Sequence, residues 1–492
     1  MQIKLENIGI VKNSSIELNG LTVITGKNNS GKSTVGKTLY ALLDAVSNIS
    51  EKFEKDKCNY IKKTLDEIGE DLHFWRLIKV YNKAFNKKLL DENSFVQVWI
   101  SGKYHELVNS GELELFIREA IHQLKQFDIK KDLVTKEVRE FIAHFYQEAN
   151  EKIQTDLIAQ ELHDAIFRME ELLETIKRDP QQIAYRKESI NQTLQKEFAG
   201  QIQPIKGQSG PSSIMLSEND KIYFHITVEN NCIENNTENQ FKPVQYKKVY
   251  LIDDPFILDN LERDRRLNQL FFNSEESLLN SGHILSHNDK LRLTLTESKQ
   301  QSIFEQTVLN DKLKNIREKI DQILPGTFEL SSEGRYYVQN GVKLQISNLA
   351  TGSKMFSIIK ILLDKGELGD STMLILDEPE AHLHPMWQNS FAEIIVLLVK
   401  ELKLNVLLTT HSPNFVLALD AYMRKYRLEE KSNFYQTQIL EDGFVQYNCM
   451  DDDIGKIYED FLQYLSEVKM LRSFYMRHGE EIESDEGMDE EG

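Results

Sequence analysis

A glycine-rich loop between an apolar strand and a helix constrains the fold of this chain more than any other segment. Residues 21–43 read LTVITGKNNSGKSTVGKTLYALL and contain the pattern G-x-x-x-x-G-K-S from Gly26 to Ser33. Such a loop turns backbone N–H groups toward phosphate, and the N-terminus of the following helix adds partial positive charge. In this pattern Lys32 reaches the β- and γ-phosphates, and the Ser33 hydroxyl binds Mg²⁺. The segment therefore predicts a nucleotide site. The residues expected to contact the nucleotide are Gly26, Asn28, Asn29, Ser30, Gly31, Lys32, Ser33 and Thr34.

The size and composition of the chain favour a multi-lobed globular protein. Its 492 residues exceed the roughly 250–300 at which a single core stops growing. No apolar run approaches the ~18 residues of a membrane-spanning helix, so no membrane association is expected. The first residues, MQIKLENIGIV, alternate apolar and polar side chains and predict a strand rather than a signal peptide. The three cysteines lie far apart and match no metal spacing, which favours a reduced, cytoplasmic protein.

The acidic charge of the chain is concentrated at its C-terminal end. The formal net charge is −19, and residues 479–492 (GEEIESDEGMDEEG) contain acids but no base. A segment with so little to bury is predicted to be a disordered acidic tail. The remaining body is still acidic, which argues against a general nucleic-acid coat and leaves open a local basic surface.

The hydrophobic pattern of the sequence divides the chain before the tail into three expected parts. Residues 1–45 carry the glycine loop. Residues 46–205 are charged and show apolar side chains three and four apart, which predicts a long helical insertion or arm. Residues 206–478 return to strand patterns and include a helical subregion at about 256–324.

Two strands in this last part end in paired carboxylates, YLIDDP at 250–255 and LILDEP at 374–379. The second is the better catalytic candidate, because the strand TMLIL delivers Asp377 and Glu378 to the carboxyl edge where ligands collect in α/β sheets. Asp377 is expected to hold Mg²⁺, and Glu378 to accept the proton of an attacking water. The next strand, in NVLLTTHSP, brings His411 to the same edge.

A third predicted element is a short polar turn before a helix, in SNLATGSKMFS at 347–357. Gly352 lies in this turn, and the N-terminus of the following helix makes it a further anion site.

The order of these motifs resembles that of ABC-type ATPases, most closely the heads of RecF, SMC and OLD-type proteins. The segment LDEPEAHLHP (376–385) resembles AAA-family ATPases of bacterial anti-phage systems such as PARIS and Septu. The resemblance implies an α/β fold, an ABC-type P-loop NTPase head with a mixed β-sheet core, flanking helices and a long helical insertion. It also implies ATP and Mg²⁺ as cofactors and homodimers packed head-to-tail, in which each head completes the site of the other.

The resemblance assigns roles to individual residues. Gly26, Lys32 and Ser33 match the P-loop, and Asp377 and Glu378 match the Walker B motif. His411 matches the switch histidine, so that Glu378, His411 and Lys32 are the implied catalytic residues.

The segment LATGSK stands where transporters have the signature LSGGQ. Leu349 and Gly352 match this signature, but Ala350 and Thr351 replace its serine and first glycine. Either Thr351 or Ser353 substitutes for the missing serine, or the turn binds through backbone N–H groups alone. No glutamine can be assigned to the Q-loop.

The order of motifs makes YLIDDP a poorer catalytic candidate than LILDEP. YLIDDP precedes the signature turn, and no THS segment follows it at the spacing that separates LILDEP from His411. Asp253 and Asp254 are interpreted as a strand end at the edge of the site, and Asp253→Asn is expected to impair hydrolysis far less than Glu378→Gln. His382 and His384 are assigned to packing or an interface rather than to zinc, which needs further ligands nearby.

Two other charged segments are not assigned to a functional site. A basic stripe (Arg76, Lys79, Lys83 and Lys87) is interpreted as a solvated face in preference to a nucleic-acid contact. The acids at 451–453 do not indicate a nuclease, because too few residues follow His411 for a nuclease domain.

Three functions follow from these features. The first is an ATPase that acts as sensor or scaffold and controls a separate effector, a nuclease or toxin, in anti-phage defence. The alternative is a RecF-like DNA-repair ATPase that binds DNA in an ATP-dependent way. A transporter subunit fits worst, because in transporters the P-loop and the signature lie much closer together.

Overall fold

The computed structural model describes most of the chain. The described residues are 1–72, 110–126, 151–177, 182–205, 211–219, 221–234, 244–259, 261, 285–296, 303–331, 334–451 and 453–485. Contacts divide the chain into two compact units. The first consists of Met1–Ser47, Arg186–Ser274 and Ile284–Gly492, and the second is built mainly on Asn48–Tyr185.

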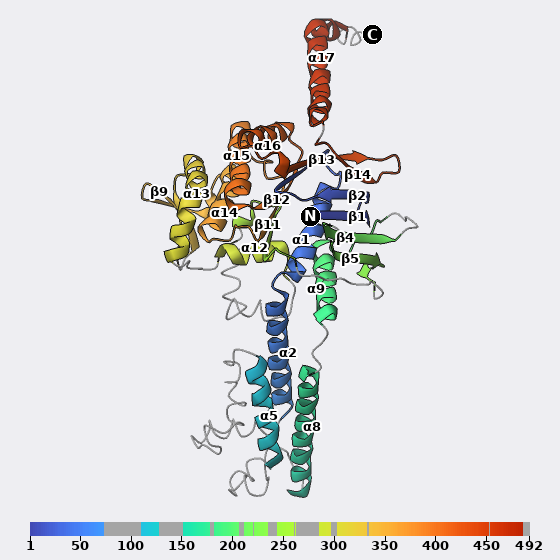
Figure 1. Cartoon of the computed structure of the whole chain (residues 1–492), viewed down its shortest axis with the longest axis vertical. Helices are drawn as coiled ribbons and strands as arrows, with labels where there is room; N and C mark the ends of the chain where they lie inside the picture. The colour runs from blue at the N-terminus through green and yellow to red at the C-terminus, as the bar shows by residue number, and fades with distance from the viewer. Residues whose placement is uncertain are drawn as a thin grey trace, which may run out of the picture. The chain divides into compact units, whose positions relative to one another are not determined.

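The first unit is organised around a mixed sheet of eleven strands in the order β6-β5-β4-β1-β2-β14-β13-β3-β12-β11-β7 (Figure 1). Five neighbouring strands, from β13 to β7, run parallel. The N-terminal hairpin pairs antiparallel with β4, and β4 with β5, whereas β14 pairs in parallel with β2. The strands are β1 (Gln2–Ile8), β2 (Val11–Glu17), β3 (Leu21–Thr25), β4 (Ser212–Glu218), β5 (Lys221–Glu229), β6 (Cys232–Ile233), β7 (Lys248–Ile252), β11 (Thr372–Asp377), β12 (Asn405–Thr410), β13 (Ser432–Ile439) and β14 (Val445–Cys449). The predicted α/β class with a mixed sheet core and flanking helices is confirmed.

The parallel strands β3, β12, β11 and β7 are buried along nearly their whole length because both faces of the sheet are covered there. On β11, Leu374 and Leu376 belong to a core cluster with helices α14 (Thr351–Asp364) and α15 (Pro385–Leu402). Ile375, between them, belongs to a second cluster with helix α1 (Lys32–Val46). Alternate side chains of one strand thus pack on opposite helical layers, as the period of a strand requires.

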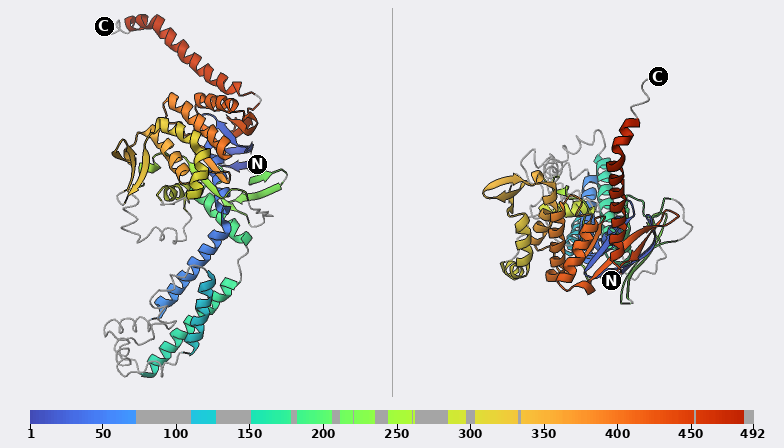
Figure 2. Two further views of the ribbon diagram at one scale, coloured as in Figure 1. Left: turned by 60° about the vertical axis from the view of Figure 1, so that its left-hand side comes forward. Right: turned by 90° about the horizontal axis from the view of Figure 1, so that it is seen from above.

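Further helices and a small sheet complete the first unit. Helices α14, α15 and α16 lie together beside the large sheet (Figures 1 and 2). The additional elements are α9 (Gln182–Glu197), which begins in the second unit, α12 (His287–Thr296), α13 (Ile303–Ile323), α16 (Pro413–Lys425), α17 (Gly455–Asp485), the 3₁₀ turns Ile346–Asn348 and Glu429–Lys431, and a three-stranded sheet of β8 (Thr327–Ser331), β9 (Gly334–Gln339) and β10 (Val342–Gln345).

The second unit is helical, as predicted for the insertion. Its described helices are α2 (Ile49–Asp71), α5 (Ser110–Gln126) and α8 (Glu151–Lys177), which pack against one another. Buried side chains recur three and four residues apart along each, for example Ile61, Leu65 and Ile68 on α2. The basic stripe at 76–87 lies outside the described residues.

The predicted acidic tail differs from the structure in its first part. Helix α17 continues through these residues as far as Asp485, and 486–492 lie outside the described residues. Glutamate is a good helix former and needs no burial to extend a helix that has already started.

A buried carboxylate links three helices of the first unit. Glu393 on α15 accepts hydrogen bonds from Lys425 Nζ (2.7 Å) and Tyr426 OH (2.8 Å), and it lies 2.8 Å from Lys319 Nζ on α13. Burial raises the pKa of Glu393, but these three donors outweigh it and lower the pKa to about 2. The folded pKa thus lies below the ordinary 4.5, so the stabilisation is complete above pH 4.5 and is lost as the pH falls toward 2.

We expect Glu393→Gln to lower the free energy of unfolding by about 1–2 kcal/mol at pH 7, because solvent screens the partly exposed lysines. The difference from wild type should shrink as the pH is lowered from 5 to about 2.5, where Glu393 itself begins to bind a proton. Urea unfolding at several pH values measures this, with Glu459→Gln on the exposed start of α17 as control. An equal deficit at every pH would contradict the assignment.

Candidate functional site

The glycine loop joins β3 to α1 and folds around the Lys32 side chain. The Lys32 ammonium is 4% exposed and donates to the backbone oxygens of Gly26 (3.2 Å) and Lys27 (2.9 Å). Gly31 has a φ of 72°, and a Cβ there would lie 2.9 Å from Cγ1 of Ile10. Glycine is therefore required at Gly31 both for the left-handed backbone and for the close approach.

Strands β13 and β14, which follow His411 in the chain, both hydrogen-bond to this loop. Neither contact was predicted from the sequence. Thr437 on β13 donates to Ser30 Oγ (2.7 Å), and Tyr447 OH on β14 donates to the Gly31 oxygen (2.6 Å). Ser30 Oγ in turn donates to the Lys27 oxygen (2.6 Å). A Cβ on Gly26 would lie 1.7 Å from Thr437 Oγ1, so this glycine makes room for the brace.

The remaining predicted loop residues lie where a ligand can reach them. Asn28 and Asn29 are exposed, and Asn29 is left-handed, with a φ of 59°. Ser33 and Thr34 lie half-buried in the first turn of α1. Ser33 thus lies at the helix N-terminus, where anions bind in proteins.

Strands β11 and β12 bring the predicted catalytic groups to one edge. The Thr409 hydroxyl donates to Asp377 Oδ1 and orients this carboxylate. Glu378 follows with a φ of 49°, a strained value for a residue other than glycine, and its N–H donates to the Thr409 oxygen (3.0 Å). Its carboxylate lies 3.2 Å from Lys32 Nζ and 3.3 Å from His411 Nδ1. The structure therefore brings Lys32, Glu378 and His411 together.

Glu380 is a further site residue that sequence reasoning missed. Its side chain is 1% exposed, and Oε1 accepts hydrogen bonds from the Thr410 hydroxyl and from the His411 N–H (3.3 Å). Burial raises the pKa of Glu380. The side chain thus fixes the turn that carries His411. The only signal of this role in the sequence is that Glu380 directly follows the DEP triplet.

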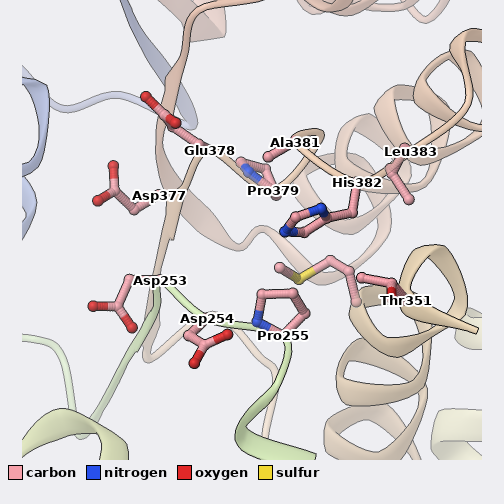
Figure 3. A pocket seen from close by; sticks show the side chains of 11 residues that line it. Asp253, Asp254, Pro255, Thr351, Asp377, Glu378, Pro379, Ala381, His382 and Leu383 are labelled. Atoms are coloured by element: carbon pink, nitrogen blue, oxygen red, sulfur yellow. The ribbon is translucent and has the colours of Figure 1, made fainter. Parts of the chain in front are cut away.

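A cavity of about 230 Å³ opens at this edge and contains both carboxylate segments (Figure 3). In Figure 3, Asp377 and Glu378 follow one strand, and Asp253 and Asp254 follow its neighbour. The lining residues are Asp253, Asp254, Pro255, Thr351, Met355, Asp377, Glu378, Pro379, Ala381, His382 and Leu383. YLIDDP therefore lines the same cavity as LILDEP.

The signature turn lies on the other side of this cavity. Thr351 lines it, and Thr351 and Gly352 are half-buried, whereas Ser353 is buried against its own helix. A Cβ on Gly352 would lie 3.2 Å from the His382 oxygen, so the turn packs closely on the segment after Glu378. Of the two hydroxyls proposed to replace the signature serine, only that of Thr351 faces the cavity.

The two histidines of AHLHP have separate structural roles. His382 packs edge-on against Phe256, with ring centroids 5.4 Å apart. His384 accepts the N–H of Met386 through Nδ1 (3.3 Å) and caps helix α15. This agrees with a packing role. In the described part of the chain, no group of three or more His, Cys, Asp or Glu side chains could hold a metal ion.

The donors at the edge fit magnesium in the presence of a nucleotide. Mg²⁺ is usually bound through one or two carboxylates together with phosphate oxygens and water. Asp377 and the hydroxyl of Ser33 offer hard oxygen ligands of this kind. A dedicated cage of protein ligands is not needed.

Three solved structures illustrate what this chain is similar to. Among solved structures, the SMC head domain from Thermotoga maritima is 9% identical over 91% of this chain and 97% of that chain, with a TM-score of 0.32. An Smc head domain with a coiled coil and joint from Pyrococcus yayanosii is 13% identical over 93% and 98%, with a TM-score of 0.32. An SmcHead bound to the C-winged helix domain of ScpA is 11% identical over 91% and 97%, with a TM-score of 0.37.

No curated protein matches the chain. Within the described residues, none of the helices has the length and apolar character needed to cross a membrane. The model of the family described as AAA ATPase domain matches residues 1–416, which include the glycine loop, the signature turn, the DEP segment and His411. The chain therefore belongs to the AAA ATPase domain family.

Proposed function

We propose that this chain binds ATP with Mg²⁺ and hydrolyses it at the carboxyl edge of the large sheet. The observation that carries the proposal is the cluster of Lys32, Glu378 and His411, joined by contacts of 3.2 and 3.3 Å. Such a cluster would offer the phosphates a cation, and it would offer the attacking water a carboxylate and an imidazole.

Catalysis of phosphoryl transfer depends mainly on positioning and on electrostatic stabilisation. Mg²⁺, held by Ser33 and Asp377, would neutralise charge on the phosphates. The buried Lys32 ammonium adds a fixed positive charge at the loop. Glu378 accepts the proton of the attacking water, and its strained backbone directs the carboxylate toward the loop.

Removal of the metal tests this proposal. Phosphate release from ATP should be measurable with Mg²⁺ and should fall to background when EDTA is added in excess, because the phosphate charge is then not neutralised. A malachite-green assay measures the release. Equal rates in both conditions would contradict the proposed site.

The signature turn supports a head-to-tail homodimer. Thr351 and Gly352 begin helix α14, and a helix N-terminus attracts phosphate. In the proposed homo-oligomer this turn faces the nucleotide of a second copy. Analytical ultracentrifugation with and without a slowly hydrolysed ATP analogue tests whether ATP drives dimerisation.

For the cellular role, we propose that the ATP-bound dimer acts as sensor or scaffold for a separate nuclease or toxin in anti-phage defence. The resemblance of the segment LDEPEAHLHP to AAA-family ATPases of bacterial anti-phage systems supports this role. Purification from the native operon tests it: an effector that copurifies and is released by ATP or by a phage trigger is the expected result. A protein that comes alone and is stimulated by duplex DNA would instead indicate a RecF-like repair ATPase.

A further inference from the structure

Strand β7 ends beside β11, and this places Asp253 next to Asp377. The two strands run parallel, with Ile252 paired to Leu376. The following residues, Asp253 and Asp377, therefore lie side by side at the same edge of the sheet. Ile252 and Leu376 both belong to the core cluster on the α14 side, so the next pair points to the opposite face, where α1 lies.

The neighbouring Asp254 has a different role. Its Oδ1 accepts the N–H of Phe256 (2.8 Å), a local bond that closes the turn after β7. Of the two aspartates in YLIDDP, only Asp253 therefore has a carboxylate directed to the face of the sheet that carries α1.

The Asp253 carboxylate has one engaged and one open oxygen. Oδ2 lies 3.0 Å from His287 Nε2, a close contact of an ion pair that does not have hydrogen-bond geometry. Oδ1 is buried and has no hydrogen-bond partner among the described residues. A buried carboxylate oxygen without a donor is destabilising unless a cation or a bound water satisfies it.

His287 is itself held by a buried carboxylate, that of Glu197. Its Nδ1 lies 2.5 Å from Glu197 Oε2, and its backbone N–H donates to Glu197 Oε1 (3.0 Å). The ring also packs edge-on against Tyr40 on α1, with centroids 5.8 Å apart. The ring is thus fixed in orientation by Glu197 on one side and faces Asp253 on the other.

We propose that Asp253 is a second carboxylate for the Mg²⁺ of the ATP site, and that His287, oriented by Glu197, is its positioning residue. Oδ2 of Asp253 contacts His287, and Oδ1 is available to bind the cation or a water on the cation. The proposal rests on the proposed ATP–Mg²⁺ site and adds a residue that motif order had assigned to the edge. Residues that orient a metal ligand typically change metal affinity 10–100-fold when they are replaced.

The test measures binding of Mn²⁺, a paramagnetic substitute for Mg²⁺, by electron paramagnetic resonance in the presence of a slowly hydrolysed ATP analogue. Asp253→Asn should weaken Mn²⁺ binding at least 10-fold, because the amide oxygen carries no full negative charge. Asp254→Asn is the matched control, since its side chain only closes the turn, and it should stay within about 3-fold of wild type.

Two His287 variants separate positioning from simple folding. His287→Gln keeps an N–H donor at the distance of Nε2 and should stay within about 3-fold of wild type, whereas His287→Ala should weaken Mn²⁺ binding about 10-fold. Melting curves establish that each variant is folded. If Asp253→Asn does not fold, the His287 pair decides: equal Mn²⁺ affinity of the Gln and Ala variants overturns the proposal.

The possible outcomes distinguish this proposal from the proposed function. If folded Asp253→Asn and His287→Ala bind Mn²⁺ as tightly as wild type, Asp253 is only an ion-pair partner, and the ATP site stands. If wild type binds neither a fluorescent ATP analogue nor Mn²⁺ with the analogue, the proposed function fails, and this proposal fails with it.

Discussion

Glu378→Gln is expected to bind ATP and to release phosphate at least 100-fold more slowly than wild type. Glutamine keeps the shape of the side chain and can still hydrogen-bond to Lys32 and His411, which lie 3.2 and 3.3 Å from the carboxylate. It cannot accept the proton of the attacking water, and loss of a general base typically reduces the rate by 10²–10⁴. Single-turnover phosphate release, measured beside ATP binding, separates the two effects.

The same variant should accumulate the ATP-bound state. If the proposed head-to-tail dimer forms on ATP, Glu378→Gln should remain dimeric in ATP for longer than wild type, as seen by size-exclusion chromatography. Glu441→Gln, an exposed residue of the β13–β14 turn, is the matched control and should behave as wild type. Normal turnover by Glu378→Gln would remove this residue from the proposed mechanism.

Lys32→Ala is expected to lose ATP binding itself, with at least a 10-fold rise in the dissociation constant. The variant removes a buried ammonium that contacts two loop oxygens and Glu378. Without this cation the loop loses its charge complement to the phosphates, and the carboxylate of Glu378 is left to repel them. Isothermal titration calorimetry with a slowly hydrolysed analogue measures the change.

A surface lysine provides the comparison for Lys32. Lys12 forms an exposed ion pair with Asp442 (2.5 Å). Lys12→Ala therefore removes one positive charge, as Lys32→Ala does, but from the surface, and it should leave ATP binding unchanged. Wild-type affinity in a folded Lys32→Ala protein would contradict the assignment of the glycine loop as the phosphate site.

The carboxylates of YLIDDP show where motif order alone was insufficient. The order of motifs ranked LILDEP above YLIDDP and assigned Asp253 and Asp254 only to a strand end at the edge of the site. In the sheet β7 lies directly beside β11, so Asp253 and Asp377 reach the same cavity. The expectation that Asp253→Asn impairs hydrolysis less than Glu378→Gln remains compatible with this geometry, because a metal ligand and a proton acceptor have different roles.

Contacts between distant parts of the chain could not be predicted for a related reason. Thr437 and Tyr447 brace the glycine loop, and Glu380 fixes the turn that carries His411. Each is an ordinary polar residue in its local sequence, and nothing in its spacing indicates its partner. The pairing of β13 with β3 brings Thr437 to Ser30.

The sequence by itself determined the parts of the site whose chemistry is local. A glycine loop between a strand and a helix, a strand that ends in Asp377 and Glu378, and a strand that leads to His411 are each readable within a few residues, because hydrophobic period and backbone freedom act over that range. Only the tertiary structure decided which strands are neighbours. Strand pairing joins residues far apart in the chain. It alone placed Asp253 beside Asp377 at the carboxyl edge of the sheet and, through His287, brought Glu197 close to that edge.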